Sequence, residues 1–356
     1  MHTPPAPTPP LTAIVGAGMA GLSCAQALTA AGHTVHLFEK SRGASGRLST
    51  RRGDGNGAGP PWQCDHGAQY FTASDPAFRA EVARWQQAGA AALWNARIAS
   101  FDGSHWSAAL APVAPVAPVE RFVGTPRMAA PAACMLQGLG RQAQLHTQTT
   151  VQQVQHGPEG WAITSAEHGG HPSRYGALVL ALPAPQVLPL LAGVSTAGTA
   201  LAASVRMRGS WALMLRCAAR VDLPFDGAFI NAGPLRWVAR DSSKPGRSGP
   251  ETWLLHATPE WSEAHMEGGA APVTAALLDA FAALGGPAAG AVKLADTAAH
   301  RWRFADTDPA SLPASASPGG WFDPCLRLGL CGDWLHGGKV QGAWLSGQQV
   351  AHHLLA

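Results

Sequence analysis

The stretch LTAIVGAGMAGLSCAQALTAAGHTVHLFEK, residues 11–40, decides the fold. It contains an apolar run, a glycine-rich turn, an alanine-rich segment that ends at Gly32, and a second apolar run that closes on Glu39. This order predicts a strand, a helix and a second strand, joined as a right-handed parallel unit.

The turn in this stretch carries a GxGxxG pattern made by Gly16, Gly18 and Gly21. Glycines with this spacing permit a tight turn, let the backbone approach a diphosphate, and allow the helix to pack on the strand. The helix N-terminus offers free N–H groups and partial positive charge to the phosphates. Glu39, at the end of the second strand, is placed to bind ribose hydroxyls. The stretch therefore predicts a dinucleotide site, which fits NAD or FAD equally.

Length and composition limit what the rest of the chain can be. A chain of 356 residues exceeds one ordinary core, so two domains are expected. The hydrophobic share of 46% and the formal charge of +3 predict a large buried core and neither a nucleic acid nor a membrane partner. Six cysteines without a CxxC pair, and no apolar run of about 18 residues, favour a reduced, cytoplasmic protein.

Several segments can be assigned from composition alone. Residues 1–10 hold five prolines and are expected to be a disordered tail. Residues 53–62 read as a flexible surface insertion, and residues 111–120, with proline at every third position, as an extended loop. Residues 271–285 have helical apolar spacing. The histidines, including HGGH at residues 168–171, show no metal-ligand spacing, so no metal site is expected.

Eight blocks of sequence together resemble renalase and its bacterial relatives, flavoproteins of the monoamine-oxidase-like group. The blocks are IVGAGMAGL, SGRLSTR, DHGAQYFT, FVGTPRM, LVLALPAPQVLPLL, LLHATPEWS, HRWRFA and CGDW…GAWLSG, and they run from Ile14 to the C-terminus. The resemblance implies FAD and a C-terminal strand and helix that return to the FAD domain. Because the turn GDWLHGG contains no cysteine and Cys331 lies on the strand before it, the FAD is expected to be bound noncovalently.

The implied fold class is α/β, a discontinuous Rossmann-like FAD-binding domain with an inserted mixed-sheet α+β substrate domain. The FAD-binding domain is expected at residues 11–75, 126–190 and 325–356. The substrate domain is expected at residues 76–125 and 191–324.

The resemblance also assigns site residues, position by position. The FAD contacts that it implies are Gly16, Gly18, Ala20, Gly21, Glu39, Lys40, Arg47, Gln69, Tyr70, Val151, Asp333, Gln341, Gly342 and Ala343. Gly16 to Gly21 and Arg47 would lie at the diphosphate, Glu39 at the adenosine ribose, and Val151 at the adenine. Asp333 would face the ribityl-diphosphate region. A helix beginning near Gln341 would point its N-terminus at flavin N1, where reduction leaves negative charge.

The resemblance implies two reactions. The first is oxidation of reduced nicotinamide dinucleotides, especially the 2- and 6-dihydro isomers, to NAD(P)+, with hydride transfer to flavin and reoxidation by O2. The second is oxidation of an amine. A dinucleotide-binding protein without redox turnover is the third hypothesis.

Two features of the sequence favour the first reaction. Amine oxidases of the group that the chain resembles often frame the substrate with a pair of aromatic rings and place a lysine near flavin N5. This chain has only two tyrosines for such a frame, and Lys293 is the one lysine in a plausible strand. A basic segment that contains Arg236, Arg240, Lys244 and Arg247 would suit a diphosphate-bearing donor at a substrate mouth. Each of these residues could equally belong to a solvated basic turn.

His256, in the apolar block WLLHATPEW, is the candidate catalytic residue. An imidazole in such a strand needs a polar partner, and His256 aligns with a histidine block of renalases. It could bind the nicotinamide carboxamide or equally be a satisfied core histidine. His300 is a weaker candidate.

Overall fold

The computed structural model describes residues 10–53, 61–108, 119–285, 292–311 and 319–356. The chain forms two compact units. Unit 1 comprises residues 1–46, 132–206 and 307–356, and unit 2 comprises residues 47–131 and 207–306.

Unit 1 is built on a six-stranded sheet with the order β19-β20-β13-β1-β2-β9. Five of these strands run parallel, and β19 is an antiparallel edge strand. Their bounds are β1 Thr12–Val15, β2 Val35–Phe38, β9 Ala143–His146, β13 Ala177–Leu180, β19 Trp321–Asp323 and β20 Leu328–Leu330. All four residues of β1 are buried, as expected for a central strand covered on both faces.

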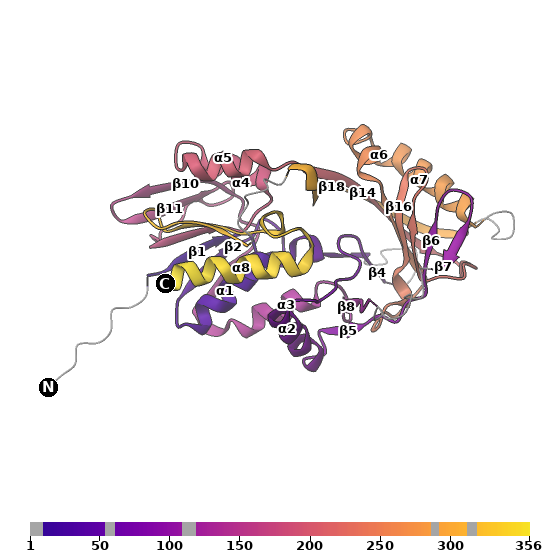
Figure 1. Ribbon diagram of the computed structural model, residues 1–356, viewed down its shortest axis with the longest axis horizontal. Coiled ribbons are helices and arrows are strands. Elements are labelled where there is room, and N and C mark those ends of the chain that lie inside the picture. Colours follow the sequence, from indigo (N-terminus) through magenta and orange to yellow (C-terminus); the bar gives the residue numbers. More distant parts are fainter. Residues whose placement is uncertain (1–9, 54–60, 109–118, 286–291, 312–318) are drawn as a thin grey trace. The chain divides into compact units, whose positions relative to one another are not determined.

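Two helices from opposite ends of the chain lie side by side in this unit: α1 (Met19–Ala30) and α8 (Lys339–Leu355) (Figure 1). Their contact is close because Gly347 has no side chain, and a Cβ there would lie 2.2 Å from the Ala20 carbonyl oxygen. The Ser23 hydroxyl donates to the Trp344 carbonyl at 2.6 Å, and this bond crosses from α1 to α8. The predicted return of the C-terminal segment to the N-terminal motif is therefore present within unit 1.

A small antiparallel sheet completes the described core of unit 1. It contains β10 (Val151–Gly157), β11 (Gly160–Ser165) and β12 (Gly169–Gly170). Three further helices are α3 (Ala130–Gly138), whose first residues belong to unit 2, α4 (Ala184–Leu191) and α5 (Thr196–Ser204).

Unit 2 is built on a seven-stranded sheet with the order β18-β14-β17-β16-β15-β6-β7. The strands are β6 Ile98–Phe101, β7 Trp106–Ala108, β14 Met207–Cys217, β15 Gly227–Ile230, β16 Leu235–Arg240, β17 Thr252–Ala257 and β18 Leu294–Thr307. The remaining elements are β3 Thr50–Gly53, β4 Trp62–Asp65, β5 Ala91–Leu93, β8 Phe122–Gly124, α2 Pro76–Gln87, α6 Pro259–Ala264 and α7 Ala270–Leu284.

The two faces of the unit 2 sheet alternate along each strand, as the strand period of two requires. In β14, Leu213 and Leu215 belong to the cluster that contains the buried face of α7. Ala212 and Met214 belong instead to a second cluster, with Trp62 and Cys64 of β4. In β17, His256 is two residues from Leu254 and therefore faces the β4 side of the sheet.

The structure confirms most of the expected elements. The strand, helix and strand of residues 11–40 and the helix predicted at 271–285 are present, the latter as α7. The compact units divide the chain at other positions than the predicted domains, because residues 47–75 pack with unit 2, and residues 191–206 and 307–324 belong to unit 1. The tail apart from Pro10, the insertion at 54–60 and most of the loop at 111–120 lie outside the described residues.

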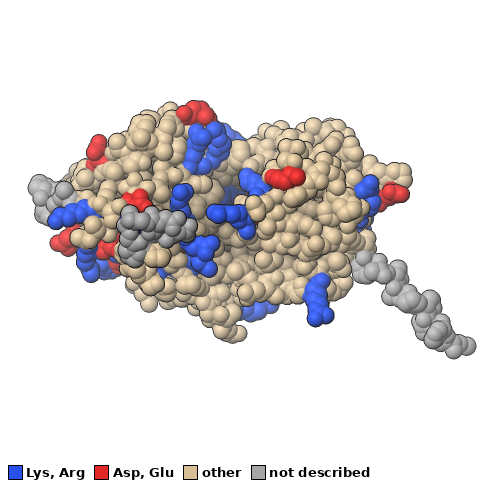
Figure 2. All heavy atoms as spheres, turned by 180° about the vertical axis from the view of Figure 1, so that it is seen from behind, with Lys and Arg blue, Asp and Glu red and all other residues tan. Residues whose placement is uncertain are grey.

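In the described part of the chain, no helix combines the length and apolar character that a membrane span requires. On the face drawn in Figure 2, basic side chains are more widespread than acidic ones, in keeping with the formal charge of +3.

Candidate functional site

The carboxyl edge of the unit 1 sheet gathers the predicted dinucleotide-binding residues of that unit. Val15 pairs with Phe38 on one side and with Leu180 on the other, and Leu180 pairs with Leu330. The residues that directly follow β1, β2, β13 and β20 therefore lie at the same edge of the sheet. Such an edge, where neighbouring connections leave in opposite directions, is where open α/β sheets bind ligands.

Gly16 occupies the centre of this edge, and its backbone requires glycine. Its φ is +102°, and a Cβ would lie 2.5 Å from the Ala181 carbonyl oxygen, which follows β13. Gly21, one turn into α1, is equally constrained, because a Cβ there would lie 1.9 Å from the Gly16 carbonyl oxygen. Around Gly18, by contrast, the nearest atom to an added Cβ is 3.9 Å away. The first and third glycines thus serve chain packing, whereas a Cβ on the second would make only ordinary van der Waals contact with Gly46.

Glu39 follows β2 and its carboxylate faces the glycine turn. Glu39 Oε2 accepts a hydrogen bond from the Ala17 N–H at 3.1 Å, and Oε1 accepts one from the Ser41 N–H at 2.8 Å. The side chain is buried, whereas the neighbouring Lys40 is exposed. Val151 begins β10 two residues beyond Thr149, whose N–H donates to the Glu39 carbonyl at 2.9 Å.

The C-terminal motif, CGDW at residues 331–334, reaches the same edge because it directly follows β20. The Trp334 indole N–H donates to the Leu182 carbonyl at 2.9 Å, directly after the Ala181 residue that touches Gly16. Asp333 is buried at the start of the short turn that follows Gly332. These contacts place Asp333 and the glycine turn on one edge of one sheet, as predicted.

The helix that ends the chain begins two residues earlier than expected, at Lys339. Gln341 and Gly342 lie in its first turn and Ala343 follows directly, and its N-cap, Gly338, has no side-chain hydrogen bond. A Cβ on Gly342 would lie 2.2 Å from the His336 carbonyl oxygen, so glycine is required here for local packing as well. Both α1 and α8 therefore start with glycine caps and offer backbone N–H groups that no side-chain cap covers.

The predicted cationic substrate mouth is wrong, because three of its four basic side chains are internal. Arg240 is buried and pairs with Glu251 at 2.9 Å. The side chains of Lys244 and Arg247 are 0% and 2% exposed. Arg236 alone is substantially exposed, and it pairs with Asp306. The segment neutralises buried acids rather than presenting positive charge to solvent.

Lys244 is the centre of a buried network that sequence reasoning missed, here called the Asp65 network: Asp65, Gln69, Asp241, Lys244 and Arg247. Lys244 Nζ lies 3.0 Å from Asp65 Oδ2, 2.7 Å from Asp241 Oδ1 and 3.2 Å from Gln69 Oε1. Arg247 also pairs with Asp65. Burial opposes ionisation of Asp65, but Lys244 and Arg247 together hold its pKa below the usual value. Burial and the Asp65 charge raise the pKa of Asp241 to about 6.

Gln69 and Tyr70, predicted FAD contacts, belong to unit 2. The Gln69 amide nitrogen donates to the carbonyl oxygens of Asp65 at 2.7 Å and Gly67 at 3.1 Å. The Tyr70 ring lies 5.6 Å from Trp237 and 5.3 Å from the guanidinium of Arg121. Arg47, also in unit 2, donates to the Ala305 carbonyl at 3.0 Å. The contacts of these residues with FAD stay predictions.

His256 has the polar partner that its sequence context demanded. Its Nε2 lies 3.2 Å from the His66 carbonyl oxygen, which also accepts the Trp302 indole N–H at 2.8 Å. The His66 ring lies 4.7 Å from the His300 ring and stacks on Trp302 at 5.2 Å. These four residues, His66, His256, His300 and Trp302, are here called the His66 cluster. His66 was not singled out from the sequence, although it stands in the block DHGAQYFT, next to Asp65.

The imidazoles of the His66 cluster are held neutral. Burial lowers the pKa of His256 to about 4 and that of His66 to about 3, and His300 is shifted in the same direction. Neutral imidazoles can donate or accept hydrogen bonds but do not take up a proton near pH 7.

Comparisons with known proteins agree with this architecture. Residues 14–85 match the family described as NAD(P)-binding Rossmann-like domain. Cyclohexylamine oxidase from Brevibacterium oxydans is similar in structure, with a TM-score of 0.71, 13% identity, and coverage of 97% of this chain and 98% of that one. Putrescine oxidase bound to putrescine gives a TM-score of 0.66 at 13% identity, over 97% and 99% of the two chains. An oxidoreductase from Methanosarcina mazei gives 0.67 at 13%, over 96% and 100%.

These likenesses establish the fold. The chain has the Rossmann-like and mixed-sheet architecture of this group of oxidases over nearly its whole length, which confirms the predicted fold class.

Proposed function

We propose that this protein is an FAD-dependent oxidoreductase whose unit 1 binds the cofactor noncovalently. The observation that supports this most is the carboxyl edge of the unit 1 sheet. There the glycine turn, Glu39 and the Asp333 motif follow β1, β2 and β20, which belong to one sheet.

The chain's residues fit such a cofactor. The glycine backbone at Gly18 and the N–H groups of the first turn of α1 suit the diphosphate. The Glu39 carboxylate suits the adenosine ribose, and the backbone of Val151 suits the adenine. The N-terminal turn of α8, with Gln341, Gly342 and Ala343, suits the electron-rich edge of a flavin. When bound, FAD supplies the hydride-accepting chemistry, and the protein binds and orients the donor.

Noncovalent binding is supported by the state of the cysteine nearest to the C-terminal motif. Cys331 is fully buried, and burial raises its thiol pKa well above the usual value. A thiol held in this form is a poor nucleophile. Denaturation is expected to release the flavin completely.

For the substrate we propose a reduced nicotinamide dinucleotide, in particular a 2- or 6-dihydro isomer of NAD(P), which would leave as NAD(P)+ while O2 accepts the electrons as H2O2. The His66 cluster supports this choice. Hydride loss from a dihydronicotinamide needs no base, and neutral imidazoles can bind its carboxamide without changing charge. The oxidation of an ammonium substrate requires loss of a proton, which side chains with such low pKa values accept poorly.

An amine substrate is the second candidate, and two observations favour it. Tyr70 lies among the rings of Trp94 and Trp237 and already holds the Arg121 cation against its face. In addition, Lys244 is a fully buried lysine, whereas Lys293, the lysine that was expected in a strand, is exposed just before β18. The similar solved structures include oxidases named for cyclohexylamine and putrescine.

Two measurements test the proposal. Purified protein should absorb near 450 nm if it carries flavin, and a colourless protein that refuses flavin would leave only a dinucleotide-binding role. Anaerobic mixing with 2- and 6-dihydroNAD(P), and separately with a panel of amines, should bleach the bound flavin with the dinucleotides. Bleaching by amines alone would reverse the ranking.

The His256→Gln variant separates substrate binding from cofactor binding. It should slow the reduction of flavin by the dinucleotide while the amount of bound flavin stays unchanged. Unchanged reduction kinetics would make His256 a residue of the core only.

A further inference from the structure

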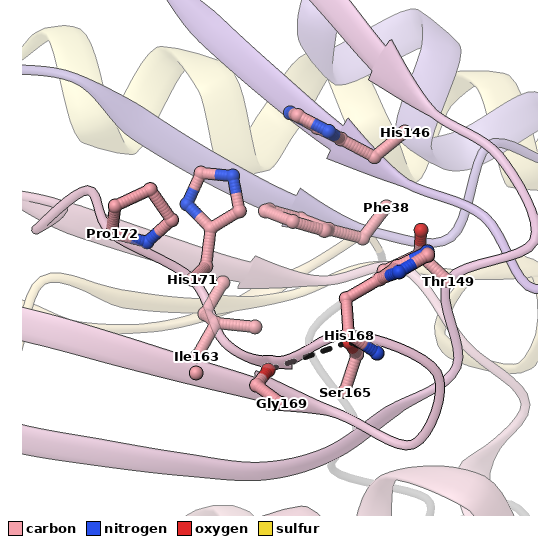
Figure 3. Close-up of a pocket in the computed structure, with 10 residues that line it drawn as sticks. Phe38, His146, Thr149, Ile163, Ser165, His168, Gly169, His171 and Pro172 are labelled. Carbon is pink, nitrogen blue, oxygen red and sulfur yellow. Dashed lines mark hydrogen bonds between the residues drawn. The ribbon is translucent and has the colours of Figure 1, made fainter.

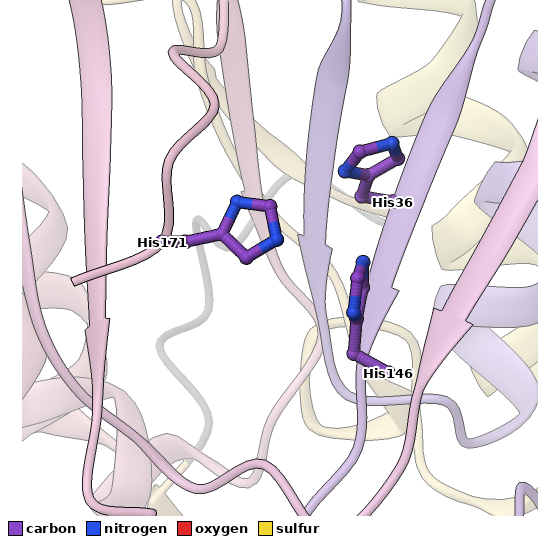
Figure 4. Close-up of side chains that lie close together, drawn as sticks. All are labelled: His36, His146 and His171. Atoms are coloured by element: carbon purple, nitrogen blue, oxygen red, sulfur yellow. The ribbon is translucent and has the colours of Figure 1, made fainter. Parts of the chain in front are cut away.

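Three histidines from separate segments of unit 1 converge beside its main sheet. His36 lies in β2, His146 lies in β9, and His171 directly follows β12. One ring nitrogen from each lies within 4.8 Å of the others. The ring centroids are 5.3 Å apart for His36 and His146, 5.7 Å for His36 and His171, and 4.9 Å for His146 and His171. Figure 4 shows the rings turned toward a common space. These residues are here called the three-histidine group.

The backbone fixes all three positions. The parallel pairing of β2 with β9 sets Phe38 opposite His146, and the two rings stack at 4.9 Å. The His171 N–H donates to the Ile163 carbonyl at 2.8 Å, so the loop after β12 is tied to β11. The group therefore spans two sheets, with two members on the main sheet and one on the small antiparallel sheet.

The Tyr175 hydroxyl contacts two of the three rings. Its side chain is fully buried, and its hydroxyl lies 3.1 Å from His36 Nδ1 and 2.8 Å from His171 Nδ1. Hydrogen bonds to the outer nitrogen of a histidine fix its orientation, as they do around metal ions. His171 Nδ1 also accepts a hydrogen bond from the Ser173 N–H at 3.3 Å, so the chain holds this ring in place on two sides.

One of the three rings presents a nitrogen that no described residue pairs with. Neutral imidazole is the ligating form, because its free nitrogen keeps a lone pair. His146 Nε2 is buried and has no hydrogen-bond partner within the described residues.

The group also has room beside it. A cavity of about 150 Å³ is lined by His146 and His171 together with Phe38, Ile163 and His168 (Figure 3). His168 is exposed at this cavity. Since a water molecule occupies about 30 Å³ of liquid, this cavity has room for water beside the His146 and His171 rings.

We propose that His36, His146 and His171 form a binding site for one divalent transition-metal ion that prefers imidazole ligands, such as Zn²⁺. Ligand nitrogens at about 2.0–2.1 Å in a tetrahedral site lie roughly 3.4 Å apart, so side-chain rotation closes the group around the ion. The purely imidazole set favours Zn²⁺, Ni²⁺ or Cu²⁺ over Mg²⁺ or Ca²⁺. With three protein ligands, water completes the coordination, and the ion cross-links the two sheets of unit 1.

The test uses the tag-free, full-length holoenzyme after chelation and dialysis, titrated calorimetrically with Zn²⁺. Wild type should bind one equivalent at this site and unfold at a higher temperature with the ion present. His36→Gln and His171→Gln should each weaken this binding by about tenfold or more. The control His105→Gln, which removes an exposed histidine of unit 2, should bind as wild type does.

A second measurement needs no variant. Electron paramagnetic resonance of wild type with one equivalent of Cu²⁺ should show hyperfine coupling to imidazole nitrogens. Equal Zn²⁺ affinity in wild type, His36→Gln and His171→Gln would overturn the proposal, and so would a Cu²⁺ spectrum without nitrogen coupling. Neither result bears on flavin binding, so this inference can fail while the proposed function holds.

Discussion

Replacing Lys244 with Met should destabilise unit 2 severely, because it removes the cation from the Asp65 network without removing the acids. The Lys244 ammonium is fully buried and contacts Asp65 Oδ2 at 3.0 Å and Asp241 Oδ1 at 2.7 Å. Without it, Arg247 is the one cation that the described residues place beside the two buried carboxylates. Breaking a buried ion pair by removing one partner costs about 3–5 kcal/mol, a large part of a typical stability of about 5–15 kcal/mol.

The assay is urea unfolding followed by tryptophan fluorescence, since the chain has 13 tryptophans. The matched control is Arg236→Met, which removes a charge from the same basic segment. The Arg236 and Asp306 side chains are 47% and 46% exposed, so this control should lose less than about 1 kcal/mol.

A double change sharpens the test. Lys244→Met with Asp241→Leu removes one cation and one anion, which leaves Asp65 paired with Arg247. This variant should regain part of the stability that Lys244→Met loses. The reasoning fails if Lys244→Met costs no more free energy of unfolding than Arg236→Met does.

Three further outcomes are expected. Glu39→Ala should weaken FAD retention on gel filtration by about tenfold or more, because hydrogen bonds to a carboxylate contribute roughly 1.5–3 kcal/mol each. Full retention of FAD in a folded variant would contradict the assignment of Glu39 to the ribose. The free energy of unfolding should fall as pH drops from about 6.5 toward 4, by up to about 1.4 kcal/mol per pH unit for His256. The reason is that the unfolded chain takes up a proton at this histidine, whereas the folded histidine, with its pKa of about 4, stays neutral. Urea titrations of His256→Gln should show a weaker dependence of the free energy of unfolding on pH. Gly347→Ala should lower the unfolding temperature at a cost of about 1–3 kcal/mol, since the new Cβ would lie 2.2 Å from the Ala20 carbonyl oxygen, whereas Gly138→Ala, with open space around it, should not.

Local sequence was enough to predict the first strand, helix and strand. The glycines, the alanine-rich helix and Glu39 stand within one stretch of the sequence, in the order that the strand, helix and strand require. The return of residues 328–355 to the same sheet followed from the resemblance to a family. The sequence of residues 328–355 does not by itself predict that β13 lies between β20 and β1.

The electrostatic state of the basic segment could not be predicted in this way. Lys244 and its partner Asp65 are 179 positions apart in the chain, and their contact depends on how β4 packs near β17. From the sequence alone, the basic segment was interpreted as a charged surface. In the structure, three of its four basic side chains are buried and paired with acidic side chains.

The histidine groups were missed for the same reason. Metal-ligand spacing is recognised when ligands lie close in sequence, but His36, His146 and His171 come from two sheets. His66 acts through its backbone carbonyl, which accepts from His256 and Trp302, and no side-chain pattern reveals a carbonyl.

The position of β20 and α8 beside β13 and α1 has a consequence for biosynthesis. A ribosome-bound chain that has not yet reached Leu328 already contains β1, β2, β9 and β13, yet the surface of α1 around Ala20 and Ser23 has nothing to pack against. Translation must therefore finish this segment before α1 is covered on this side. During that interval the nascent polypeptide exposes the flank of α1 to chaperones and proteases.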